Sequence, residues 1–343
     1  MIDKIELKKT NFINKTDTRL LKGIAIILML VYHFFTFPEW YVNGIGYSYS
    51  VLLEKYLYGP TQWCVALFAF ITGYVYYFNN NKTFLYSINK IKSLLNDYWV
   101  YLIFLTVIAL YFNKITLNVL WMGELLAFSN LHNTVMVFSW YIQFYVVVIL
   151  FLPVYSKYIS KSLFWDFCTG ILFFYGLKHV ITGIENTGFL RTICLWTPYV
   201  FGGWITAKYN LYFKISDKFK LENKSKIFYF TFTFLFFMSG LTRSHLAKYL
   251  LLPLFVLFLI YLLNNCNKIT KDILAEFGKY SMNIWFLHCM FFNVTKDIFQ
   301  PIAFYPGNPI LVLLWVMLLC FVIVKIIDVV KTKWLKVYKC FNI

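Results

Sequence analysis

The sequence predicts an all-α integral membrane protein, a single bundle of about ten transmembrane helices with both termini in the cytoplasm. Three observations lead to this fold class. Of the 343 residues, 60% are hydrophobic and only 14% are charged, whereas soluble domains carry about 25% charged residues. Apolar stretches long enough to cross a bilayer recur along the chain. Lysine and arginine are concentrated in alternate connecting segments.

A helix needs about 20 mainly apolar residues to cross the hydrocarbon core, and ten stretches approach or reach this length. They lie at approximately 20–37, 60–79, 96–113, 135–155, 163–182, 190–207, 226–242, 246–264, 279–298 and 309–330. An eleventh apolar run, 117–128, is short and contains Glu124, so we expect a surface or re-entrant helix there. No linker or internal repeat divides the chain, and we expect residues 1–343 to form one transmembrane domain.

The distribution of basic residues predicts how the ten spans are oriented. With a cytoplasmic N-terminus, 25 of the 32 lysine and arginine residues fall in cytoplasmic segments, as the positive-inside rule requires. The formal net charge of +17 is therefore explained without nucleic acid, and membrane lipid is the expected partner. The first apolar segment is too long for a cleavable signal peptide and lacks a small-residue cleavage site. We expect it to remain as a helix of a multi-pass protein of the cell membrane.

The first span carries an ionisable side chain, His33, deep within an apolar helix. Such residues are rare in lipid unless they face a protein interior and have a function there. Lys22 precedes His33 by 11 positions, which is close to three helical turns or roughly 16 Å, so both side chains lie on one face. Arg19 extends the same face. This geometry suits an anionic ligand held at the membrane surface with its reactive end directed inward.

A second histidine, His288, lies nine positions after Lys279, which is expected at the cytoplasmic edge of the ninth span. Ser281, Trp285 and His288 share one helix face because they are spaced by four and three residues. Two interpretations remain open. His288 either assists His33 in chemistry or forms a structural hydrogen bond to a neighbouring helix.

Several familiar catalytic and ligand-binding motifs do not occur in the sequence. There is no HExxH, GxSxG, P-loop or GxGxxG pattern, and few carboxylates fall inside the spans, which disfavours a proton-coupled transporter. The seven cysteines include no CxxC pair and fall mostly in apolar segments. We interpret them as packing residues and predict no metal site.

An ordered series of motifs resembles the membrane-bound acyltransferase 3 family, which includes O-acetyltransferases of bacterial surface polysaccharides. Lys22 and His33 match a family pattern of arginine, ten residues and histidine, with lysine replacing arginine as a point charge. The remaining motifs follow in the family's order: Phe68 to Tyr74, Lys90 to Lys92 ahead of Tyr98 and Trp99, Ser139 to Tyr141, Pro198 to Gly203, and Phe277 to His288. The resemblance covers nearly the whole chain, and the family's ten helices agree with the ten predicted spans.

The resemblance implies a membrane O-acyltransferase that uses acyl-CoA, with acetyl-CoA as the expected co-substrate. Lys22, Arg19, and Lys90 or Lys92 would hold the CoA phosphates, and His33 would act as general base. His288 would orient His33 or assist the acceptor.

By family analogy, the acceptor is a hydroxyl of a cell-surface glycan or a lipid-linked sugar. Some relatives carry an extra esterase-like domain, which the sequence does not show, so we expect direct transfer, although an acyl-histidine intermediate stays open. The alternatives are a non-enzymatic polysaccharide transporter or flippase, and a transferase or polymerase that acts on lipid-linked glycans without CoA. The transporter explains less well why a cation and a histidine share one helix face.

Overall fold

The computed structural model describes residues 11–42, 47–117, 119–127, 134–173, 188–219 and 245–341, and all regular structure within them is helical. The elements are α1 (Lys15–Phe35), η1 (Pro38–Trp40), α2 (Tyr47–Thr61), α3 (Trp63–Phe78), α4 (Phe84–Tyr111), α5 (Val119–Leu125), α6 (Trp140–Val154), the π-helical turn η3 (Tyr155–Ile159), α7 (Leu163–Ile171), α9 (Gly188–Lys208), α10 (Leu211–Phe219), α12 (His245–Asn264), α13 (Lys268–Lys279), α14 (Ser281–Leu287), η5 (His288–Phe291), α15 (Lys296–Ala303) and α16 (Pro309–Phe341).

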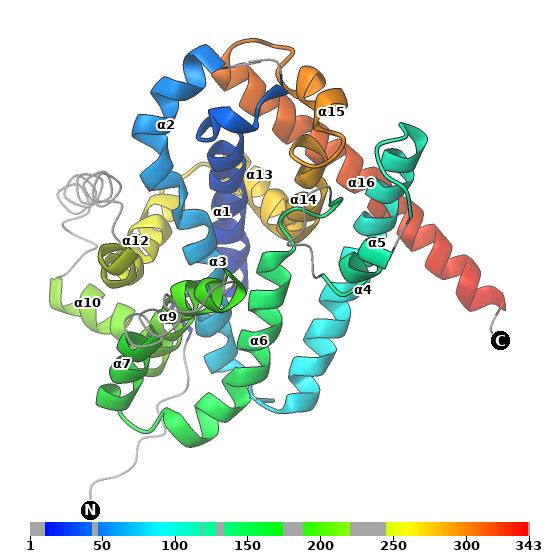
Figure 1. The fold of residues 1–343 in the computed structure, drawn as a ribbon. Coiled ribbons are helices and arrows are strands. Elements are labelled where there is room, and N and C mark those ends of the chain that lie inside the picture. Colours follow the sequence, from blue (N-terminus) through cyan, green and yellow to red (C-terminus); the bar gives the residue numbers. More distant parts are fainter. Residues whose placement is uncertain are drawn as a thin grey trace, which may run out of the picture.

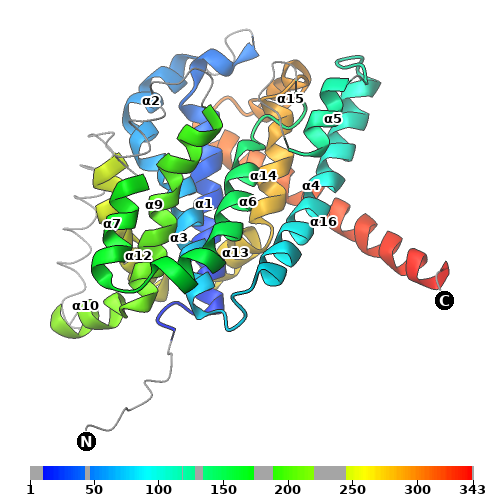
Figure 2. The same cartoon turned by 60° about the horizontal axis from the view of Figure 1, so that its bottom comes forward.

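The membrane character expected from composition is supported by helix length and hydropathy. Four helical stretches in the described residues are long and apolar enough to cross a bilayer, at Lys15–Phe35, Phe84–Tyr111, Trp140–Ile159 and Pro309–Lys333. Lys248–Asn264 is a shorter apolar helix. Figures 1 and 2 both show the last part of α16 extending away from the other helices. Apolar side chains along α16, such as Leu314 and Ile326, are more than half exposed, as expected for a lipid-facing surface.

The described helices agree with most predicted spans, but the ninth span requires a correction. Residues 279–298 do not form one continuous helix, because α14 ends at Leu287, a 3-10 turn follows, and α15 begins at Lys296. Asn293 and Thr295 explain the break: the Thr295 backbone and hydroxyl both donate to Asn293 Oδ1, and these local bonds compete with the helical ladder. The seventh span, 226–242, and residues 174–182 of the fifth lie outside the described residues.

Connecting segments contain helices that the sequence did not predict. These are α2, α10 and α13. In the part of the apolar run 117–128 that the structure describes, residues 117 and 119–127, the regular structure is the seven-residue helix α5. A helix of this length is too short to span the membrane, as expected from the sequence. Figure 2 shows α2, α5 and α15 near one end of the bundle, with α10 and α13 toward the other.

Close helix crossings fix the centre of the bundle. Gly23 of α1 and Gly278 of α13 face each other so closely that a methyl group on either would overlap backbone of the other helix. Gly73 of α3 and Gly203 of α9 form a second crossing of the same kind. Small residues permit such backbone approach in membrane helices. These two crossings hold α1 and α3, which contribute to both cavities of the site described below.

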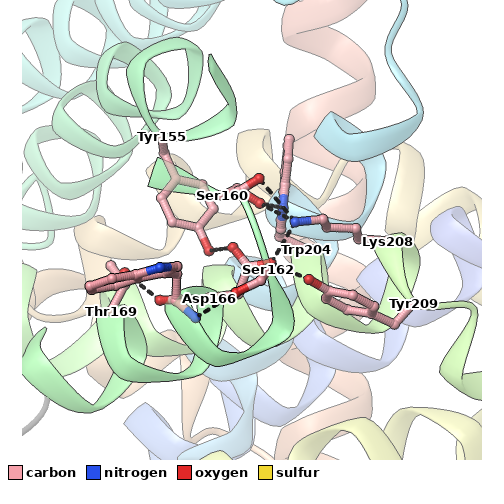
Figure 3. Close-up of polar contacts among 9 residues, drawn as sticks. Tyr155, Ser160, Ser162, Asp166, Thr169, Trp204, Lys208 and Tyr209 are labelled. Carbon is pink, nitrogen blue, oxygen red and sulfur yellow. Dashed lines mark hydrogen bonds and ion pairs between the residues drawn. The ribbon is translucent and has the colours of Figure 1, made fainter. Parts of the chain in front are cut away.

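A buried carboxylate joins the end of α6 to α7 and α9 (Figure 3). Asp166 is fully buried and accepts hydrogen bonds from Tyr155 Oη at 2.8 Å, Lys208 Nζ at 2.8 Å and Tyr209 Oη at 2.9 Å. Lys208 also donates to the carbonyl and hydroxyl oxygens of Ser160. A buried charge with this many partners is satisfied, so we assign this cluster a structural role.

Candidate active site

Two buried histidines from distant parts of the chain meet inside the bundle. His33 of α1 and His288, the first residue of η5, are 7% and 0% exposed. The distance from His33 Nδ1 to His288 Nε2 is 2.9 Å, and the two rings are nearly parallel. Although the residues are 255 positions apart, they therefore form one hydrogen-bonded pair.

The hydrogen-bond pattern determines where the protons of this pair lie. His288 Nδ1 lies 2.5 Å from the carbonyl oxygen of Trp285. A carbonyl oxygen only accepts, so His288 carries its proton on Nδ1 and leaves Nε2 as an acceptor. His33 must then donate from Nδ1, and in a neutral ring its Nε2 holds a free lone pair. The Nε2 atom of His33 is thus the basic atom of the pair.

An aromatic ring covers both histidines and fixes their planes. Phe138 stacks on His33 with ring centroids 4.3 Å apart and on His288 with centroids 4.8 Å apart. The backbone just before Phe138 is anchored by Glu124 of α5. The Glu124 carboxylate accepts the backbone N–H groups of Val135 and Met136 at 2.9–3.0 Å. Burial raises the pKa of Glu124, and these N–H donors oppose the shift.

His33 faces a cavity of about 220 Å³, which we call the histidine cavity. Its lining consists of aromatic residues and a few polar groups: Met29, Tyr32, His33, Gln62, Cys64, Val65, Trp140, Thr192, Trp196 and Trp285. The rings of Trp140 and Trp196 are stacked 6.3 Å apart. Aromatic walls with a few polar groups are typical of sites that bind small organic molecules.

A second cavity, of about 300 Å³, contains two of the predicted cationic residues and is called the lysine cavity. Lys22 of α1 and Lys90 of α4 line it, together with hydroxyl groups from Thr18 and Ser281. Asp97 also lines it, but this carboxylate forms an ion pair with Lys331. Lys22 and Lys90 consequently leave the cavity attractive to an anionic ligand.

Three aromatic rings meet at the boundary between the two cavities, and we call them the aromatic partition. Phe68 and Tyr141 line the lysine cavity, whereas Trp285 lines the histidine cavity. The ring of Trp285 is 4.8 Å from that of Tyr141 and 5.8 Å from that of Phe68. Helices α1, α3, α6 and α14 contribute residues to both cavities. The two cavities therefore follow one another along the same group of helices.

The structure brings some of the predicted site residues together and leaves others apart. His33 and His288 are in contact, and Lys22 and Lys90 share one cavity. Arg19 and Lys92 are exposed and are not among the residues that line the lysine cavity. Both exposed cations lie close in sequence to a lysine that does line it.

Sequence analysis assigned no role to three residues that the structure places at or beside the histidines. Gln62 lines the histidine cavity, Phe138 stacks on both rings, and Glu124 anchors the segment before Phe138. Phe138 directly precedes the Ser139–Tyr141 motif, which was the available signal. For Glu124 the only signal was a charged residue within an apolar run. For Gln62 there was no signal, because its contacts with Tyr32 and Lys248 are distant in sequence.

An all-helical membrane bundle with a buried histidine pair at one of two neighbouring cavities is the architecture of a membrane enzyme or transporter. Comparison with known families decides between these classes. Residues 17–328 match the acyltransferase 3 family model, described as an acyltransferase domain. The chain therefore belongs to the acyltransferase 3 family. No curated protein and no solved structure matches it.

Proposed function

We propose that this protein transfers an acetyl group from cytoplasmic acetyl-CoA to a hydroxyl of a cell-surface or lipid-linked glycan. The observation that carries the proposal is the His33–His288 pair, whose basic Nε2 atom belongs to the residue that lines the histidine cavity. Family membership supports acyltransferase activity. The proposal involves no metal ion.

The lysine cavity is the proposed donor site. Lys22 and Lys90 would act as charge partners for the phosphates of acetyl-CoA. The exposed cations Arg19 and Lys92 would attract the nucleotide end from the cytoplasm. The acyl-bearing arm would then pass the aromatic partition toward His33, because the same helices line both cavities.

His33 is the proposed general base. The acceptor oxygen attacks the thioester carbon while its proton passes to His33 Nε2. When the carbon–sulfur bond breaks, the thiolate takes that proton from the imidazolium, and CoA leaves as a thiol. His288 stabilises the imidazolium by accepting the hydrogen bond from His33 Nδ1. Acyl transfer is direct in this scheme, and no acyl-enzyme forms.

The composition of the histidine cavity supports a sugar as the acceptor. Trp140, Trp196 and Trp285 line it, and flat aromatic faces pack well against the apolar faces of sugar rings. Gln62 and Thr192 supply hydrogen-bonding groups on the same walls. The proposal also includes the ten-span arrangement with cytoplasmic termini. In that arrangement the lysine cavity faces the cytoplasm and the histidine cavity faces the outside.

Radiolabelled acetyl-CoA added to membranes that contain the protein tests this function. We expect alkali-labile label in the glycan fraction, and we expect His33→Ala to lower the rate by about 10²–10⁴-fold because the base is lost. Equal labelling by wild type and His33→Ala would remove His33 as the base. Movement of unmodified glycan without any acyl transfer would instead indicate a transporter.

The donor site is tested by Lys22→Ala in the same assay. Because one phosphate partner is lost, we expect the acetyl-CoA concentration needed for half-maximal rate to rise by roughly 10- to 100-fold, as one hydrogen bond to a charged group is worth about 1.5–3 kcal/mol. The maximal rate should change little. Lys161→Ala is a matched control, because this exposed lysine donates to the Lys157 carbonyl and is not among the residues that line the cavity. An unchanged donor dependence in Lys22→Ala would contradict the phosphate-binding role.

A further inference from the structure

Acyl transfer from a thioester requires a hydrogen-bond donor in addition to a base. Negative charge develops on the carbonyl oxygen in the transition state, and enzymes direct preorganised donors at that position. The histidine pair does not supply such a donor. The single N–H of neutral His33 is directed at His288, and that of His288 is directed at the Trp285 carbonyl. Another polar group on the wall of the histidine cavity must therefore provide the donor.

Gln62 is placed to be that donor. It lies between α2 and α3 and lines the histidine cavity together with His33. Its Oε1 atom accepts a hydrogen bond from Nζ of Lys248 on α12. An ammonium group only donates, so this contact determines which end of the amide faces Lys248. The NH2 end is directed the other way, where it contacts Tyr32 Oη at 3.5 Å. Tyr32 is the neighbour of His33 in α1.

Two features make this amide a strong donor that remains available. Lys248 is only 1% exposed, and its ammonium polarises the amide through the carbonyl oxygen, which strengthens the opposite N–H groups. The contact with Tyr32 is at the limit of hydrogen-bond distance and uses one of the two amide protons. We infer that Gln62 Nε2 donates a hydrogen bond to the oxyanion of the acyl-transfer transition state. This inference rests on the proposed function.

The complete step balances as follows. The acceptor oxygen forms a bond to the thioester carbon, its proton moves to His33 Nε2, and the carbonyl electron pair moves to the oxygen. Gln62 Nε2–H donates to this oxyanion. The carbon–oxygen double bond then re-forms, the carbon–sulfur bond breaks, and the thiolate takes the proton from His33. The products are the glycan ester and CoA.

Two substitutions test the inference in membranes that contain the full-length protein. Gln62→Glu retains a partner for Lys248 but replaces the amide donor by a carboxylate that only accepts. Gln62→Met has a similar length and no donor. For both, we expect kcat for transfer from acetyl-CoA to the glycan fraction labelled by wild type to fall by about 10²–10³-fold. The KM values for acetyl-CoA and for the glycan fraction should stay within about threefold, because the contact forms only in the transition state.

Other outcomes would overturn the inference. If kcat of Gln62→Met stays close to that of wild type, Gln62 is not the donor. If only KM for the glycan rises, Gln62 binds the acceptor and does not stabilise the oxyanion. A loss of thermal stability in both variants that matches the loss of activity would indicate a structural role. The wild type and His33→Ala separate the two proposals. Absence of acetyl transfer by the wild type contradicts the proposed function, and an active His33→Ala contradicts the role of His33 as the base. An inactive His33→Ala with an active Gln62→Met contradicts only the role of Gln62.

Discussion

At the scale of single residues, the hydrogen-bonding capacity of one carbonyl group determines the state of the whole site. The Trp285 carbonyl accepts the proton of His288 Nδ1, which leaves His288 Nε2 to accept from His33. In this way a backbone group on α14 selects the tautomer of a side chain on α1. A base in the right place but in the wrong tautomer would present an N–H to the acceptor hydroxyl and could not remove its proton.

The positioning role of His288 is tested by two substitutions that differ in one property. The amide oxygen of Gln can replace His288 Nε2 as an acceptor for His33 Nδ1–H, whereas Leu cannot. We expect His288→Leu to lower kcat by about 10²-fold and His288→Gln to recover part of that loss. Acetyl-CoA binding, measured by calorimetry on the detergent-solubilised protein, should be unchanged in both. Equal activities of the two variants would argue against a hydrogen-bonding role.

At the scale of secondary-structure elements, the motif glycines act through helix packing. Gly23, Gly73, Gly203 and Gly278 all lie within the motifs noted in the sequence, and each lies where two helices cross with backbones in contact. These crossings fix α1 and α3, which contribute to both cavities. The motifs therefore contain packing residues alongside the proposed chemical groups.

Adjacent glycines in α9 provide a matched test of this packing. A methyl group on Gly203 would overlap the backbone of α3 at Phe70, so we expect Gly203→Ala to cost about 1–3 kcal/mol of stability. The nearest atom to a methyl on Gly202 is a Tyr249 ring carbon at 3.6 Å, which is ordinary contact. Thermal unfolding of the solubilised protein should show a lower midpoint for Gly203→Ala, with Gly202→Ala close to wild type. The same loss in both variants would contradict the assignment.

At the scale of the whole molecule, the arrangement of the two cavities matches a reaction that joins reactants from opposite sides of a membrane. Four helices, α1, α3, α6 and α14, contribute to both cavities, which meet at the aromatic partition. Lys22, near the start of α1, lines one cavity, and His33, near its end, lines the other. If the lysine cavity is the donor site, as proposed, the start of α1 must lie on the cytoplasmic side.

Cysteine accessibility tests that orientation. Ile269 on α13 and Tyr305 after α15 are 72% and 85% exposed, and the ten-span arrangement places them inside and outside, respectively. In a variant without the native cysteines, we expect Tyr305→Cys to react with a membrane-impermeant maleimide in intact cells. Ile269→Cys should react only after the cells are permeabilised. The reverse pattern would mean that the chain has the opposite orientation in the membrane, with the proposed donor cavity outside the cell.

Composition and residue spacing were sufficient to predict the membrane class, the family resemblance, the helical face that carries Lys22 and His33, and a run at 117–128 that does not span the bilayer. These properties depend on composition and on spacing within one helix, which are local. The break after Leu287 and the extra helices α2, α10 and α13 were not predicted, because hydropathy gave no signal for them. At α13, for example, the Asn267 side chain accepts the Thr270 N–H and caps the start of the helix.

The groups that surround His33 depend on how the helices pack. The contacts of His33 with His288 and Phe138, and that of Gln62 with Lys248, join residues more than 100 positions apart, so no local pattern encodes them. Likewise, no local pattern indicates that Lys22 and Lys90 line the lysine cavity whereas Arg19 and Lys92 do not. Periodicity gives the face on which a side chain lies, but the close crossings at the glycines determine what that face meets.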